Sequence, residues 1–117
     1  MNTEVTMYGV ASCDTVKKAG VALKAAGWTV TLHDVKKRGL PAERLAAWMD
    51  ALGWEPLVNR RGTTWRGLPP EVAASVVDAA SAVAVLVQHP SAMKRPVIAW
   101  PSGQVTVGFT PELWPTL

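Results

Sequence analysis

Cysteine is scarce in this chain of 117 residues, which holds only one, Cys13. A single thiol excludes a disulfide within the chain and a zinc site built from several thiolates, and it is typical of a reducing compartment. Long apolar runs are also missing, because the longest, Ala79 to Val87, is shorter than the roughly 20 residues that cross a bilayer. The first nine residues do not resemble a signal peptide. We therefore expect a cytoplasmic protein with no membrane partner.

A strong excess of one charge is absent as well. Twelve Lys and Arg against nine Asp and Glu give a formal net charge of +3, and 49% of the residues are hydrophobic. This is a globular composition, and its mild positive charge permits an anionic ligand but lacks the dense basic stripe of nucleic-acid binders. The two histidines, His33 and His89, are far apart in sequence and form no obvious ligand set with Cys13. We expect no nucleic-acid partner and no metal.

The pattern of apolar residues predicts an α/β fold with a four-stranded mixed sheet. Strands over 5–8 and 29–35 flank a helix that begins near Ser12 or Asp14, its candidate caps, and stops at Gly27. Two strands joined by a helix are expected to be parallel. Strands over 96–100 and 104–107 are joined by a Pro-Ser-Gly turn and form an antiparallel hairpin.

The sequence between the two strand pairs is mostly helical. Residues 36–39 read as a charged turn, Pro41 as the first residue of a helix that ends at Gly53, and 59–64 as a loop. A helix opening at Pro69-Pro70 would bury Val72, Val76 and Ala79/Ala80, and another would cover 81–88. A last short helix starts at 110–112. We expect one domain over 1–117, with sheet halves at about 1–35 and 95–117 and a helical insert at about 40–90.

Cys13 carries the strongest chemical signal. It follows a strand and a turn and lies in the first turn of the predicted helix, where unpaired N–H groups and the helix dipole favour the thiolate over the thiol. Lys17, one turn later, adds a cation. The alternative is a buried structural cysteine, which is common. Because Val16 stands where a second cysteine of a Cys-x-x-Cys pair would be, an external thiol must complete any redox cycle.

Three arginines are candidate anion-binding residues. Arg60 and Arg61 lie in the predicted loop, and Arg95 directly precedes Pro96 at the start of a strand. The planar guanidinium of arginine binds a carboxylate or an oxyanion through two parallel hydrogen bonds. The alternative for each of the three is a solvated surface charge.

Several segments, in order and with similar spacing, resemble the arsenate reductase (ArsC) family. They are Tyr8–Ala19, Asn59–Arg66, His89–Val97 and the ending Val107–Phe109. The pair Cys-Asp-Thr-Val-Lys-Lys and Asn-Arg-Arg-Gly-Thr-Thr resembles the YffB-like branch of that family in particular.

The resemblance implies a thioredoxin-like fold with a helical insert and a nucleophilic cysteine at Cys13. It implies a site arginine at Arg60 or Arg61, since the local alignment is ambiguous by one position. It also implies a site arginine at Arg95, followed by a cis Pro96 that borders the cysteine pocket. We expect a glutathione-dependent thiol reductase that acts on a small thiol or oxyanion substrate. Glutathione would be its co-substrate, with no tightly bound cofactor.

Two departures from the family pattern qualify this expectation. True arsenate reductases of this type carry a third arginine near the end of the chain, where this sequence has Phe109 within Val107–Thr110. Arsenate is therefore the less favoured substrate. The related Spx regulators, which bind RNA polymerase, typically carry Cys-x-x-Cys, and Val16 breaks that pattern here. An Spx-like, non-enzymatic regulator of RNA polymerase stays as the alternative hypothesis.

Overall fold

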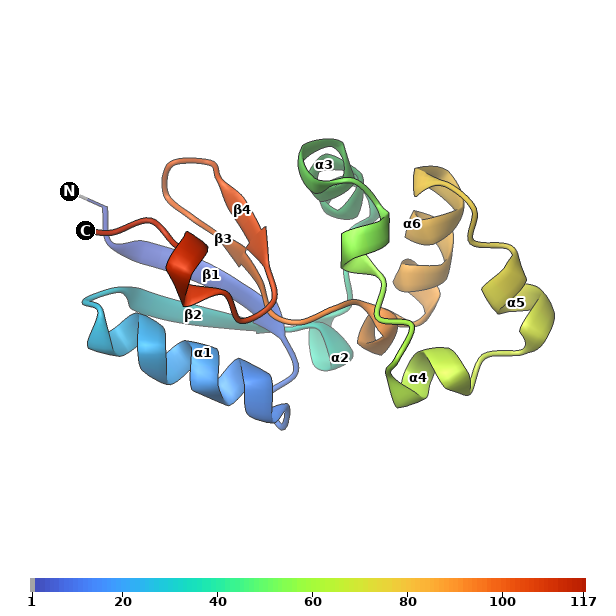
Figure 1. Cartoon of the computed structure of the whole chain (residues 1–117), viewed down its shortest axis with the longest axis horizontal. Helices are drawn as coiled ribbons and strands as arrows, with labels where there is room; N and C mark the ends of the chain where they lie inside the picture. Colours follow the sequence, from blue (N-terminus) through green and yellow to red (C-terminus); the bar gives the residue numbers. More distant parts are fainter. Residues whose placement is uncertain (1) are drawn as a thin grey trace. The chain divides into compact units, whose positions relative to one another are not determined.

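A computed structural model describes residues 2–117, so Met1, the first residue of the expected domain, lies outside the described part. The chain divides into two compact units (Figure 1). The first joins the residues up to Arg38 with Arg95–Leu117, and the second is Gly39–Lys94. That the two units form one domain stays a prediction.

The first unit is built on a four-stranded mixed sheet, as the sequence predicted. Its strands are β1 (Glu4–Gly9), β2 (Thr29–Asp34), β3 (Val97–Ala99) and β4 (Val105–Val107). Their order is β2-β1-β3-β4, with β1 and β2 parallel and the other two pairings antiparallel. The strand–helix–strand crossover explains the parallel pair, and the 101–103 turn explains the hairpin.

Helix α1 (Asp14–Ala25) runs along one face of this sheet (Figure 1). Its buried face consists of Val16, Ala19 and Leu23, and it packs on a core that includes Met7 of β1 and Ile98 of β3. Burial of a side chain of this size contributes about 1.5–3 kcal/mol, so α1 is firmly anchored to the sheet. Two indoles complete the core: the rings of Trp28 and Trp100 meet edge to face, with centroids 5.0 Å apart.

The structure corrects three helix starts in the prediction. The N-cap of α1 is Cys13 itself, and neither Ser12 nor Asp14 holds that position. The predicted charged turn is a single helical turn, α2 (Val35–Arg38), because the Asp34 carboxylate accepts hydrogen bonds from its first free amides. Pro41 is the N-cap of α3 (Ala42–Leu52) and not its first helical residue.

The second unit is helical apart from an isolated bridge between Val58 and Met93. Besides α3 it contains η1 (Glu55–Leu57), α4 (Thr63–Arg66), α5 (Pro70–Ala74), α6 (Ala79–Gln88) and η2 (Pro90–Ala92). Helices α3 and α6 pack against each other. Their buried side chains are Leu45, Trp48, Met49, Ala82, Val85 and Leu86.

Two predictions for this unit were wrong. The segment predicted as a loop over 59–64 already enters α4 at Thr63. The helix that opens at Pro70 stops at Ala74, since Asp78 and Ser81 form a capping box that starts α6 anew. Ala79 and Ala80 therefore lie exposed in the first turn of α6 and are not buried. In the first unit, the last predicted helix is the 3-10 turn η3 (Pro111–Leu113).

None of the helices formed by residues 2–117 has the length and apolar character needed to cross a bilayer.

Candidate active site

Four strand ends meet at one edge of the first unit. Because β1 and β2 are parallel, Gly9 lies beside Asp34 at their carboxyl ends. The antiparallel register pairs Tyr8 with Val97 and Val97 with Val107, so β3 begins and β4 ends at this same edge. The segments that hold Cys13, Asp34, Arg95–Pro96 and Phe109 therefore gather here.

Cys13 lies at the junction between the turn that follows β1 and the start of α1. Its backbone N–H donates to Val10 O at 3.0 Å and closes the turn, and its carbonyl accepts from Lys17 N at 3.0 Å and opens the helix. As N-cap, with φ −76° and ψ 125°, it occupies the position from which a side-chain acceptor reaches the first helical amides. The side chain is half-buried against the core. The side chain makes no capping hydrogen bond to the first helical amides, and its partial exposure leaves the thiol accessible.

Gly9 permits the close approach of β1 to the start of α1. The sequence indicated only that this glycine ends a strand. A Cβ at this position would lie 2.6 Å from Val16 Cγ2. Val16 is 2% exposed and its branched side chain has little freedom to move away. The glycine therefore helps to set where Cys13 enters the helix.

The Arg95–Pro96 peptide bond is cis, as the family resemblance implied. Pro96 is buried, Arg95 is half-buried, and Pro96 O accepts a hydrogen bond from Gly108 N at 2.8 Å. That bond ties the start of β3 to the residue before Phe109. The ring of Phe109 packs edge-on against Trp114, with centroids 5.8 Å apart.

Arg60 and Arg61 belong to the second unit and are both exposed. Their loop is anchored at Asn59, whose N–H donates to Ala92 O at 2.9 Å and whose side-chain oxygen accepts from Arg61 N at 3.3 Å. The Arg60 guanidinium lies over the Trp54 ring, 5.6 Å from its centroid. Such a contact restricts the side chain of Arg60. The choice between Arg60 and Arg61 as the site arginine stays open.

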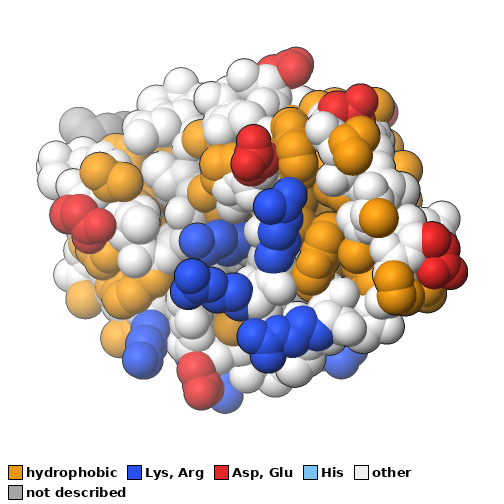
Figure 2. Space-filling model, turned by 45° about the vertical axis from the view of Figure 1, so that its right-hand side comes forward, with side chains coloured by type: hydrophobic (Ala, Val, Ile, Leu, Met, Phe, Trp, Pro, Cys, Tyr) orange, Lys and Arg blue, Asp and Glu red, His pale blue; other side chains and the backbone are white. Residues whose placement is uncertain are grey.

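A hollow of about 410 Å³ lies at the Cys13 edge of the first unit. It is lined by Val10, Ala11, Ser12, Asp34, Lys36 and Lys37. Lysine and arginine side chains are exposed on the face drawn in Figure 2, in keeping with the positive net charge. Within residues 2–117, no cluster of three or more His, Cys, Asp or Glu side chains is placed to hold a metal ion.

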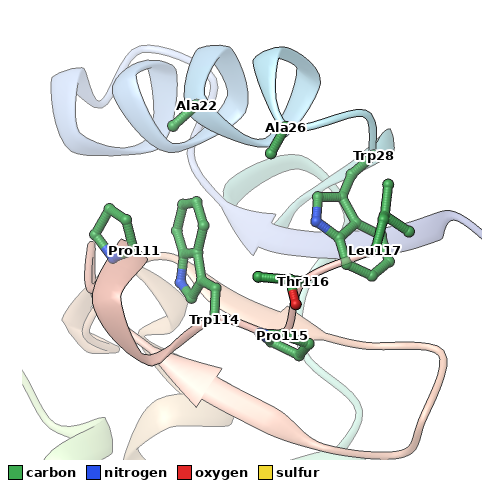
Figure 3. Close-up of a pocket in the computed structure, with 8 residues that line it drawn as sticks. All are labelled: Ala22, Ala26, Trp28, Pro111, Trp114, Pro115, Thr116 and Leu117. Atoms are coloured by element: carbon green, nitrogen blue, oxygen red, sulfur yellow. The ribbon is translucent and has the colours of Figure 1, made fainter.

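A second hollow, of about 340 Å³, lies between the C-terminal half of α1 and the last residues of the chain (Figure 3). Ala22 and Ala26 line one side, and Trp114 stands opposite them with its Nε1 atom buried and without a hydrogen-bond partner. Cys13 lies at the other end of α1, about 20 Å away along the helix axis. The candidate chemistry therefore belongs to the sheet edge and not to this hollow.

The sheet order β2-β1-β3-β4 and the helix α1 packed on one face of the sheet define a thioredoxin-like fold. The ArsC family model matches residues 8–117, and the chain belongs to this family.

Relatives along nearly the whole chain support this assignment. An uncharacterized protein of Haemophilus influenzae is 40% identical over 105 residues, which cover 90% of both chains. The solved structure of a protein called YFFB (PA3664) is 37% identical, with a TM-score of 0.85 over 92% of this chain and 93% of its own. An arsenate reductase (ArsC) related protein from Brucella melitensis is 46% identical, with a TM-score of 0.72 over 96% of this chain and 90% of its own.

Proposed function

We propose that this protein is a glutathione-dependent thiol reductase in which Cys13 is the only nucleophile. The observation that carries the proposal is the position of Cys13 as N-cap of α1, at the sheet edge where Pro96 directly precedes β3. Membership of a family whose relatives include an arsenate-reductase-related protein supports this reaction class.

The reaction requires two thiol–disulfide exchanges. In the first, the Cys13 thiolate attacks the glutathione sulfur of a mixed disulfide R–S–S–G, forms a Cys13–S–S–G bond and releases R–S⁻, which takes up a proton. In the second, the thiolate of reduced glutathione attacks the glutathione sulfur on Cys13. This step releases oxidised glutathione and restores the Cys13 thiolate. The net change is that R–S–S–G and one molecule of reduced glutathione become R–SH and oxidised glutathione, without metal or prosthetic group.

The surrounding residues would position the charged parts of glutathione. Arg95 is half-buried at the Cys13 edge and would bind a carboxylate with its guanidinium. The buried Pro96 would form the wall against which the tripeptide backbone lies. Arg60 or Arg61 would supply a second anion contact, as the resemblance implies.

Intact mass spectrometry with oxidised glutathione tests the proposal. Wild-type protein should gain the mass of one glutathionyl group, and reduced glutathione should remove it. Cys13→Ser should gain none, because this is the only cysteine of the chain. A wild-type protein that takes up no glutathione contradicts the reductase proposal. If it also captured RNA polymerase subunits, that result would favour the Spx-like regulator, which otherwise stays a hypothesis.

A further inference from the structure

The Asp34 carboxylate joins two segments that are far apart in sequence. One oxygen, Oδ1, accepts hydrogen bonds from Lys36 N at 2.9 Å and Lys37 N at 3.1 Å, which caps α2. The other, Oδ2, accepts from Ala11 N at 3.1 Å, across 23 residues of sequence. Each oxygen therefore serves a different segment, and only the second bond reaches the turn that leads to Cys13.

Few other contacts restrain the turn over residues 10–13. It is closed at its base by the bond from Cys13 N to Val10 O. Its corner residues, Ala11 and Ser12, are exposed, so packing contributes little to their position. A hydrogen bond to an ionised carboxylate is stronger than one between neutral groups. The bond from Ala11 is therefore a main restraint on the corner directly before the cysteine.

Asp34 keeps its charge at neutral pH. The Ala11 amide is the largest influence that lowers the pKa of this carboxyl below its ordinary 3.8, and the amides of Lys37 and Lys36 and the charge of Lys37 act in the same direction. The carboxylate is thus an ionised acceptor under all conditions in which the thiol reacts.

We propose that Asp34 is a positioning residue for Cys13: by holding the Ala11 amide, it fixes the 10–13 turn and keeps the thiol at the N-cap of α1. This inference rests on the proposed function, in which Cys13 is the nucleophile. It assigns to the end of β2 a role in the reactivity of a cysteine that follows β1.

Asp34→Asn separates this role from the capping of α2. Asparagine caps helices as well as aspartate does, so its single carbonyl oxygen can keep the α2 amides. Its NH₂ group then faces the Ala11 N–H, donor against donor, and that bond is lost. Asp78→Asn is the matched control. The Asp78 carboxylate also caps a helix, α6, but within residues 2–117 it accepts hydrogen bonds from Ser81 alone.

The measurement is the rate of iodoacetamide alkylation of Cys13 at pH 7. In Asp34→Asn we expect alkylation to slow about threefold or more, because the turn no longer holds the thiol at the N-cap of α1. Removal of a negative charge by itself acts in the opposite direction, since it favours the thiolate. An alkylation rate that is unchanged or higher therefore overturns the proposal. Asp78→Asn should keep the wild-type rate.

Two further readouts keep the test decisive. If Asp34→Asn does not fold, the amide proton of Ala11 is followed by NMR in the wild-type protein. Its chemical shift should titrate with the Asp34 carboxyl at acid pH, and a flat response overturns the proposal. The glutathionylation assay is scored separately. If wild-type Cys13 reacts faster with iodoacetamide than Cys13 in Asp34→Asn, but the wild type takes up no glutathione, the proposed function is contradicted and the positioning role of Asp34 is not.

Discussion

Trp100 Nε1 donates a hydrogen bond to Thr106 Oγ1 at 3.0 Å, inside the core of the first unit. Both residues are buried, at 4% and 8% exposure. Thr106 pairs with Ile98 across the hairpin of β3 and β4, and Trp100 follows two residues after Ile98. The bond lets an indole fill the core between α1 and the sheet without leaving a polar atom unpaired. The same Trp100 ring meets the ring of Trp28, which follows α1, edge to face.

Removal of one partner of this pair should destabilise the protein by about 1–3 kcal/mol, because the other is left buried and unpaired. Thr106→Val removes the acceptor with little change in volume. Thr106→Ser, which keeps the hydroxyl, is the control and should lose less. Urea unfolding monitored by tryptophan fluorescence measures both. Equal stability of Thr106→Val and the wild type would show that the bond contributes nothing.

Gly9→Ala should destabilise the fold by about 1–3 kcal/mol, the usual cost of overpacking. The new methyl group would meet Val16 Cγ2 at 2.6 Å, and the two must separate. The double variant Gly9→Ala/Val16→Ala should recover part of the loss relative to Val16→Ala alone. Thermal unfolding of the four proteins checks this. Additive effects would contradict the predicted clash.

Arg95→Lys should weaken glutathione binding and adduct formation nearly as much as Arg95→Ala does. Lysine keeps the charge but lacks the planar pair of donors. Arg44→Ala, at an exposed position on α3, is the control. The measurement is the glutathione concentration at half-maximal adduct formation. If the free energies calculated from these concentrations agree within about 0.5 kcal/mol between the Arg95 variants and the control, Arg95 is an ordinary surface residue.

Arsenate should be turned over far more slowly than the roughly 1 per second of an ordinary enzyme. Phe109 occupies the region where the family's third arginine is expected, and its ring packs on Trp114. Loss of one charged hydrogen-bond partner costs an oxyanion site about 1.5–3 kcal/mol. Arsenite formation in the presence of glutathione is the assay. A rate at or above about 1 per second would contradict the inference drawn from this position.

The contribution of Asp78 to stability should depend on pH. Hydrogen bonds from the Ser81 side chain and backbone lower the pKa of this carboxyl below its ordinary 3.8. A lowered pKa in the folded state means that the stabilisation is present above about pH 4 and is lost as the pH falls through the folded value. Asparagine can keep the cap but not the charge that these hydrogen bonds favour. Asp78→Asn should therefore unfold at a lower urea concentration than the wild type at pH 7, and the difference between the two midpoints should narrow toward pH 2. A gap independent of pH would contradict this.

Several parts of the fold were predictable because they depend on neighbouring residues. Alternating apolar runs defined the strands, and glycines such as Gly27 and Gly53 marked helix ends. The crossover rule then made β1 and β2 parallel. Helix caps were less predictable: Cys13 took the position that Ser12 or Asp14 was expected to hold, since the choice among adjacent residues depends on where the preceding strand ends.

The sequence by itself determined which reactive groups this protein has: one thiol at the start of a helix, no second cysteine beside it, and arginines in its loops. The tertiary structure alone decided which groups meet. The bond from Ala11 to Asp34 spans 23 residues and exists because β1 and β2 pair in one register, a relationship that no local pattern encodes. In the sequence Asp34 is one residue of a predicted strand, and only the folded sheet shows that one of its oxygens caps α2 while the other holds the cysteine turn.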